Sequence, residues 1–196
     1  PNLYLCVMKL PIVAYGDPVL KKVAGEIGPD YPQIDALIAD MFETMYHAQG
    51  VGLAAPQVGL SIRLFVIDAT PFGEDDEQLK GFKKVFLNAQ ITEESGDKWA
   101  FNEGCLSIPD IREDVSRHQQ LHIRYQDENW NWHEERYHGL AARVIQHEYD
   151  HIEGKLLTDR LSPLRKAMLK NRLEAISKGM VKVDYKMKFP NLKKGR

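Results

Sequence analysis

Cysteine is scarce in this sequence of 196 residues, which contains only Cys6 and Cys105. A fold held by disulfides needs more cysteines, and residues 1–7 are too short and uncharged for a secretion signal, so we expect a cytoplasmic protein with reduced thiols. Long apolar runs are also missing, because none approaches the roughly 20 residues that a membrane-spanning helix needs. We therefore expect no membrane partner, and Cys105 is available as a thiolate ligand or nucleophile.

The rest of the composition is that of an ordinary globular protein, with 43% hydrophobic and 28% charged residues. A domain of this length buries about 70% of the surface of its unfolded chain, so we expect one catalytic domain over residues 1–196. The segment that begins at Met8 is typical of a natural start. We therefore expect residues 1–7 to be an added segment, or an extension without a catalytic part.

Acidic residues are few near the C-terminal end. Residues 165–196 contain eleven Lys or Arg but only two acids, a local charge of +9, so the net charge of −2 leaves −11 for the first 164 residues. A basic segment on an acidic body indicates a polyanionic partner such as RNA. A solvated helix followed by a frayed basic tail over about 181–196 would explain the same charges, and both interpretations stay open.

One short segment, Gln-His-Glu-Tyr-Asp-His at 146–151, is typical of a metal hydrolase. His147 and His151 are four residues apart, so on a helix their imidazoles lie on one face and can bind one metal ion. Glu148 would lie beside that ion, where it can take a proton from bound water. Apolar residues before the segment give the helix a stripe that packs inside a domain, which argues against an exposed, charged helix.

A catalytic site of this kind takes three protein ligands and leaves one position for water. One class of metalloprotease adds a histidine downstream, but Leu157 occupies that position here and excludes the class. Another class uses a glutamate, for which Glu174 is the candidate, although a salt bridge within its basic helix is the simpler role. Cys105 is the better candidate, because it lies in a tight Glu-Gly-Cys-Leu-Ser turn and thiolates bind zinc or iron. Three histidines in or beside a predicted strand are expected at the surface: His122, His133 and His138.

Helices are expected at both ends of the chain, with strands between them. The spacing of apolar residues predicts a helix over 33–48, and a cap followed by proline predicts a short helix at residue 18 and a longer one from 163 to Gly179. Strands are predicted at four places: 63–68, 84–88, 89–92 and about 121–137, the last as two strands joined by a turn at 127–131. This order predicts an α+β fold, in which mainly antiparallel sheets pack around a central metal-binding helix, with N-terminal helices and a C-terminal helix.

Three complete motifs occur in order along the chain: Gly-Val-Gly-Leu-Ala-Ala-Pro-Gln at 50–57, Glu-Gly-Cys-Leu-Ser at 103–107 and His-Glu-Tyr-Asp-His at 147–151. Together they resemble the three motifs of the peptide deformylase family. The resemblance runs from about Met8 to Leu161 and departs from the family at Ala89, where Asn-Pro is frequent. It implies a hydrolase that removes the formyl group from the N-terminal methionine of newly made proteins and releases formate.

The resemblance also implies the chemistry of the site. It makes three residues the ligands of one divalent metal ion: Cys105, His147 and His151. Fe(II) is the common native metal of the family, and zinc, nickel or cobalt can occupy the site. Glu148 would be the general base and then the general acid for a metal-activated water that attacks the formyl carbon. The Gln57 side-chain amide and the Leu106 backbone N–H would stabilise the charge on the formyl oxygen.

Substrate binding is expected around the same motifs. The backbone at Val51 and Gly52, with Gly104, is expected to pair with the substrate peptide like an added strand. The segment does not match a phosphate loop, because the preceding strand, the third glycine and the lysine are missing. Leu140 and Val144 are candidates for an apolar slot that takes the methionine side chain, since they lie on the metal-facing side of the helix.

Charged residues near the motifs have several interpretations. Arg112, after the second motif, is also typical of the family and is expected at the substrate site. Arg143, one turn before His147, fits either the rim of the site or a salt bridge. Glu103 is expected to be a structural acid or to support a ligand, paired with Arg117.

Two other functions fit parts of the sequence. An endopeptidase would use the same helix motif with Glu174 as third ligand. A non-catalytic RNA- or ribosome-binding module would need a structural metal site closed by a fourth ligand, for which we find no candidate. The deformylase interpretation instead predicts a monomer that acts on formyl-methionyl nascent peptides, and weak ribosome contact through the basic C-terminal segment would favour such an enzyme.

Overall fold

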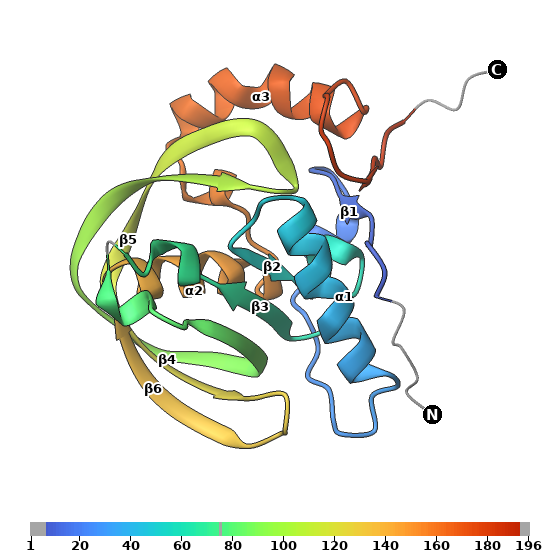
Figure 1. The fold of residues 1–196 in the computed structure, drawn as a ribbon. Helices are drawn as coiled ribbons and strands as arrows, with labels where there is room; N and C mark the ends of the chain where they lie inside the picture. Colours follow the sequence, from blue (N-terminus) through green and yellow to red (C-terminus); the bar gives the residue numbers. More distant parts are fainter. Residues whose placement is uncertain (1–6, 75, 193–196) are drawn as a thin grey trace.

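The fold is built on one curved antiparallel sheet (Figure 1). The structure is a computed structural model, and it describes residues 7–74 and 76–192. Its largest part is a long hairpin, in which β4 (Lys83–Cys105) pairs with β5 (Ile108–Gln126). Three shorter strands complete the sheet, in the order β2-β3-β4-β5-β6: β2 (Gly52–Ala54), β3 (Leu64–Asp68) and β6 (Trp132–His138). The predicted α+β class with a mainly antiparallel sheet is confirmed.

β4 is longer than the sequence predicts. The segments 84–88 and 89–92, predicted as separate strands, belong to one strand, and its pairing with β5 shifts register between Leu87 and Gln90. Asn88, at this shift, has a φ of 52°, and its side-chain amide donates to the Ile27 carbonyl at 2.7 Å. A bulge of this kind bends a strand while its pairing continues. The sheet therefore curves at residue 88 instead of ending there.

Helices cover both faces of the sheet. Side chains alternate along β3, so that Val66 packs towards α1 (Ile34–His47) while Phe65 packs towards α2 (Gly139–Ile152). This sorting follows from the two-residue period of a strand. α2 lies in the middle of the molecule (Figure 1) and buries the alanines and Ile145 of its apolar stripe against the sheet. The predicted central helix is confirmed.

α3 (Pro163–Ser177) closes one end of the long hairpin. Its Ser162 cap accepts a hydrogen bond from the Arg165 N–H at 3.2 Å, and Leu169 and Leu173 pack in a cluster with Val115 of β5. The predicted C-terminal helix is confirmed. Short 3-10 helices connect the other elements: Pro18–Lys21, Ala55–Val58, Thr70–Phe72, Glu77–Leu79 and Leu157–Arg160.

The segment after α3 is packed on the molecule. β7 (Met187–Lys188) pairs in parallel with β1 (Ile12–Val13), so distant parts of the chain meet here. From residue 181 to residue 189 the side chains alternate between half-buried and exposed. The expectation of a frayed tail over 181–196 is therefore wrong as far as residue 192. We call residues 181–189 the C-terminal strap.

Some expectations fall outside the described residues. Residues 193–196 of the basic tail lie outside them, and of residues 1–7 only Val7 is described, as an exposed side chain. That residues 1–196 form one catalytic domain stays a prediction. Within the ranges 7–74 and 76–192, no helix is long and apolar enough to cross a membrane.

Candidate metal centre

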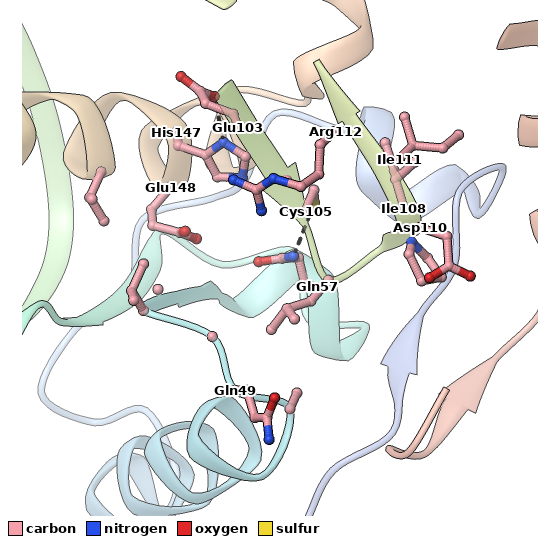
Figure 2. A pocket seen from close by; sticks show the side chains of 18 of the residues that line it. Gln49, Gln57, Glu103, Cys105, Ile108, Asp110, Ile111, Arg112, His147 and Glu148 are labelled. Atoms are coloured by element: carbon pink, nitrogen blue, oxygen red, sulfur yellow. Dashed lines mark hydrogen bonds and ion pairs between the residues drawn. The ribbon is translucent and has the colours of Figure 1, made fainter. Parts of the chain in front are cut away.

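α2 and the end of β4 bring three metal-binding side chains together. The ligand atoms of Cys105, His147 and His151 all lie within 4.8 Å of one another, and the Cys105 Sγ is 3.5 Å from the His151 Nε2. Figure 2 shows Cys105 and His147 on facing elements of the pocket. Among the described residues this is the one group of three or more His, Cys, Asp or Glu side chains placed to hold a metal ion.

The surroundings of the two histidines fit a bound divalent metal. His147 Nδ1 is 2.9 Å from the Glu103 carboxylate, which leaves Nε2 for the site. Burial and the neighbouring His147 lower the pKa of His151 to about 3, so this imidazole is neutral, as a ligand must be. Burial opposes protonation of His147 too, but hydrogen bonds with Cys105 and Glu103 raise its pKa to about 10. A metal binding there would displace a proton.

Glu148 lies beside the three donors and points into the same pocket (Figure 2). Its side chain is 4% exposed, and its Oε2 has no hydrogen-bond partner among the described residues. Burial raises the pKa of this carboxyl to about 7, and the charges of His147 and Arg117 offset it only in part. A Cβ at Gly52 would collide with the Glu148 carboxylate, so only glycine fits opposite it. The position suits a group that exchanges a proton near neutral pH.

Gln57 and Leu106 lie beside Cys105, one across a contact of its side chain and the other next to it in the chain. The Gln57 Oε1 accepts from the Ala54 N–H at 2.9 Å, which turns its Nε2 towards the Cys105 Sγ at 3.6 Å. Leu106 forms the turn between β4 and β5, and its side chain lies so close to Gly50 that a Cβ there would be 2.8 Å from the Leu106 Cδ1. Gly50, at the start of the first motif, therefore lets the β4–β5 turn approach the backbone of that motif closely.

A buried ion network lies beneath the site. Arg117, which is 2% exposed, donates to both oxygens of Glu103 at 2.7 and 2.9 Å and to Asp150 at 2.7 Å. The predicted pairing of Glu103 with Arg117 is confirmed. Burial raises the pKa of Glu103, but hydrogen bonds from His147 and Arg117 outweigh it and hold that pKa far below its usual value. Arg143 is buried and also donates to Glu103, at 2.8 Å, which confirms the salt bridge, and it lines the pocket as well, so both interpretations of Arg143 hold.

Replacing Arg117 with methionine is expected to lower the free energy of unfolding by about 3 kcal/mol. This is the lower end of the range for breaking a buried ion pair, because Arg143 and Arg160 would still pair with Glu103 and Asp150. Urea unfolding followed by circular dichroism measures the change.

The control for this substitution is Lys178→Met, which breaks the exposed pair of Lys178 with Glu174 on α3. Exposed pairs contribute little, so the midpoint of unfolding should not move. If Arg117→Met shifted the midpoint no more than this control does, the network would not stabilise the fold as we infer.

A pocket of about 790 Å³ is lined by Cys105, His147 and Glu148. All the residues predicted for substrate binding line it: Val51, Gly52, Gly104, Arg112, Leu140 and Val144. Arg112 donates from Nε and Nη2 to Asn102 at 2.8 Å each, and its Nη1 lies so near Gly104 that a Cβ there would be 2.7 Å away. The two hairpin strands thus place Arg112 over Gly104 at the pocket wall.

Other predicted residues lie apart from the donors. Glu174 pairs with Lys178 on the exposed side of α3 and is not part of the metal-binding group, so it cannot be the third ligand that an endopeptidase would need. Of the three histidines expected at the surface, only His138 is exposed. The other two are half-buried near carboxylates, with His122 3.3 Å from Glu134 and His133 2.7 Å from Asp127.

One wall of the pocket was not predicted from the sequence. Four residues of the C-terminal strap line it: Lys182, Val183, Asp184 and Tyr185. The Tyr185 hydroxyl donates to the Leu106 carbonyl at 2.8 Å, which joins the strap to the β4–β5 turn. The signal was present in the sequence, since residues 181–189 alternate between apolar or aromatic and charged side chains, as a half-buried strand does.

Comparisons with known proteins agree with this geometry. A family model described as polypeptide deformylase matches residues 9–167. A peptide deformylase of Christiangramia forsetii is 60% identical over 196 residues, covering 96% of this chain and 100% of the relative, and one of Flavobacterium johnsoniae is 58% identical with the same coverage. The crystal structure of a peptide deformylase from Legionella pneumophila superposes with a TM-score of 0.75 at 36% identity, covering 87% of this chain and 96% of that one.

Proposed function

Since the chain belongs to the peptide deformylase family, a family of hydrolases, we propose that it removes the formyl group from the N-terminal formyl-methionine of newly made proteins. The products are formate and a free amino terminus. The observation that carries this proposal is the meeting of the Cys105, His147 and His151 donors within 4.8 Å beside the buried Glu148. Three protein donors leave a position open for water, as in catalytic rather than structural sites.

The donor set fits one divalent metal ion, which would supply a Lewis acid that lowers the pKa of a bound water. We take Fe(II) as the native metal, with zinc, nickel and cobalt as ions that the same thiolate and imidazoles would accept. Support comes from the orientation of His147 by Glu103, at 2.9 Å, which resembles the carboxylate–histidine pairs that tune metal sites.

Glu148 would move the proton of the reaction. Its carboxylate takes a proton from the attacking water as the new C–O bond forms at the formyl carbon. It returns that proton to the amine nitrogen as the C–N bond breaks, so that formate and the amine leave with the atoms of one water added. Its burial opposite Gly52, which raises its pKa to about 7, suits both directions of transfer.

Gln57 and Leu106 would stabilise the charge that develops on the formyl oxygen. The Gln57 Nε2 already faces the Cys105 Sγ, because its own carbonyl oxygen is held by Ala54. Donors that are fixed before the reaction cost no reorganisation during it. A neutral amide also suits this position, since a carboxylate there would compete for the metal.

The pocket walls would hold the substrate by its main chain and first side chain. Val51, Gly52 and Gly104 line the pocket, and their backbone groups would pair with an extended peptide that adds as a strand. Leu140 and Val144 are half-buried on α2, precede His147 in the sequence and line the pocket. They would form the slot for the methionine side chain. Arg112 would lie at the wall beside the entering chain.

The test of this function uses protein purified without oxygen. A formyl-methionyl tripeptide is added, formate release is measured, and metal content is determined on the same sample. Release of formate, with no cleavage of an internal peptide bond, is expected. If metal-loaded protein released no formate, the proposed function would be wrong.

Replacing Gln57 with alanine is expected to lower turnover about 10²–10³-fold, the usual loss for one oxyanion donor. Gln49→Ala is a matched control, because Gln49 lines the same pocket but is exposed at the end of α1; its turnover should stay within about two-fold. Formate release measures both variants. Turnover of Gln57→Ala within tenfold of wild type would remove the proposed role of Gln57.

We also infer that the protein is a monomer and that it acts in the cytoplasm, where formyl-methionyl nascent peptides are made. We further infer a weak contact with the ribosome. Support for the contact is the exposed basic side of α3, which presents Lys166 and Lys170. Because α3 packs on the hairpin, the variant to use is Lys166→Glu with Lys170→Glu rather than a truncation. Co-sedimentation with ribosomes should fall in this variant, and unchanged sedimentation would contradict the contact.

A further inference from the structure

We propose that the C-terminal strap is a wall of the substrate groove that selects, by charge, the residues that follow the formylated methionine. This inference rests on the proposed function, since it concerns the same pocket. The strap begins after α3 and lies beyond residue 167, where the match to the family model ends. The family match therefore assigns no role to it.

The strap is fixed along the groove at two points. Near its end, the Ile12 N–H donates to the Lys186 carbonyl and the Ala14 N–H donates to the Lys188 carbonyl, both at 2.9 Å. Before that, the Tyr185 hydroxyl donates to the Leu106 carbonyl at 2.8 Å. The strap is thus held against the turn that carries the proposed oxyanion donor, and its pocket-facing residues have a defined position.

The charged side chains at the pocket belong to the exposed set of the strap. Lys182 and Asp184 are exposed and line the pocket, whereas Val183 between them and Tyr185 after them are half-buried. The charged side chains of a bound peptide would contact Lys182 and Asp184. Its main chain or apolar groups would contact Val183 and Tyr185. Lys182 and Asp184 carry opposite charges and are two residues apart, so each would attract peptide side chains of the opposite sign and repel those of its own sign.

The groove has room for more than one residue. At about 790 Å³ it lies towards the upper end of the range for small-ligand pockets. Figure 2 shows Glu148 and His147 on one side, and Ile108 and Asp110 on the side away from Glu148. An extended peptide rises about 3.3 Å per residue. With its formyl group at the metal donors, the residues after the methionine would therefore lie beside the other walls of the pocket.

The experiment compares kcat/KM for three peptides in full-length, metal-loaded protein. One has two glutamates after formyl-Met-Ala, one has two lysines there, and the third is formyl-Met-Ala alone. Lys182→Glu is expected to lower the ratio of kcat/KM for the acidic peptide to that for the basic peptide about five-fold, the range of exposed charge pairs. Asp184→Lys is expected to raise the ratio by a similar factor. Each ratio compares two peptides in one variant, so a change in catalysis that is common to both peptides cancels. The short peptide measures that common change.

Lys186→Glu is the matched control, since Lys186 is exposed on the same strap but does not line the pocket. It changes the net charge by the same amount as Lys182→Glu, so a general charge effect would appear in both. A shift in Lys182→Glu with none in Lys186→Glu supports the proposal. Equal shifts in the two, or no shift in either pocket variant, would overturn it. Failure of the wild-type protein to cleave the short peptide would instead overturn the proposed function.

Discussion

Replacing Glu148 with glutamine is expected to lower formate release about 10²–10⁴-fold while the metal content stays at the wild-type level. Glutamine has nearly the shape of glutamate, so it fits the space that Gly52 leaves open. It cannot accept the proton of water, and Glu148 is not among the three donors that meet within 4.8 Å. The substitution therefore removes proton transfer and leaves the metal ligands in place.

Two measurements on the same sample decide the role of Glu148: turnover and metal per protein. Glu153→Gln is the control, because Glu153 follows the same helix and pairs with Arg63 at 2.7 Å, away from the pocket. This control should retain nearly full turnover. A Glu148→Gln protein within tenfold of wild type would contradict the assignment, and a protein that lost its metal would show that Glu148 acts as a ligand.

Replacing Cys105 with alanine is expected to abolish both metal binding and turnover. Even the loss of a residue that only supports a ligand costs 10–100-fold in metal affinity, so the loss of a ligand itself should exceed about 100-fold. Two histidines would remain, which is fewer than the three protein ligands of a catalytic site. Metal per protein after dialysis measures the loss, and formate release on the same sample should fall with it.

The same experiment separates the deformylase from an endopeptidase. Glu174→Ala should leave metal content and turnover unchanged, because Glu174 pairs with Lys178 at an exposed position on α3. The opposite result, with metal lost in Glu174→Ala and kept in Cys105→Ala, would support a peptidase site. Substitution of Cys105 by serine offers a second variant of nearly unchanged size, in which the weaker oxygen ligand should reduce metal binding less completely.

The parts predicted well from the sequence are those in which a local pattern determines the structure. The helix that carries His147 and His151 follows from their four-residue spacing and its apolar stripe, and α1 follows from the same period. Gly52 and Gly104 were expected at the substrate site, and both line the pocket. Short-range rules were sufficient for these features.

The features that the sequence did not predict depend on contacts between residues far apart in the chain. Residues 93–104 of β4 are mostly exposed and polar, so no apolar alternation marks them, and they are strand because β5 pairs with them. Pairing of Glu103 with Arg117 was expected, but the bridge from Arg117 to Asp150 joins β5 to α2 and has no local signal. The strap did carry an alternating pattern, yet its high charge favoured the interpretation of a solvated tail.

The parallel pairing of β1 with β7 sets an order of events in the synthesis of the protein itself. Residues 12–13 can pair with residues 187–188 only after residue 188 has been translated, and closing so long a loop comes late in folding. The metal ligands and the helix that carries them are translated earlier. An unfinished chain could therefore assemble the metal centre, but the wall formed by Lys182 to Tyr185 would be added last.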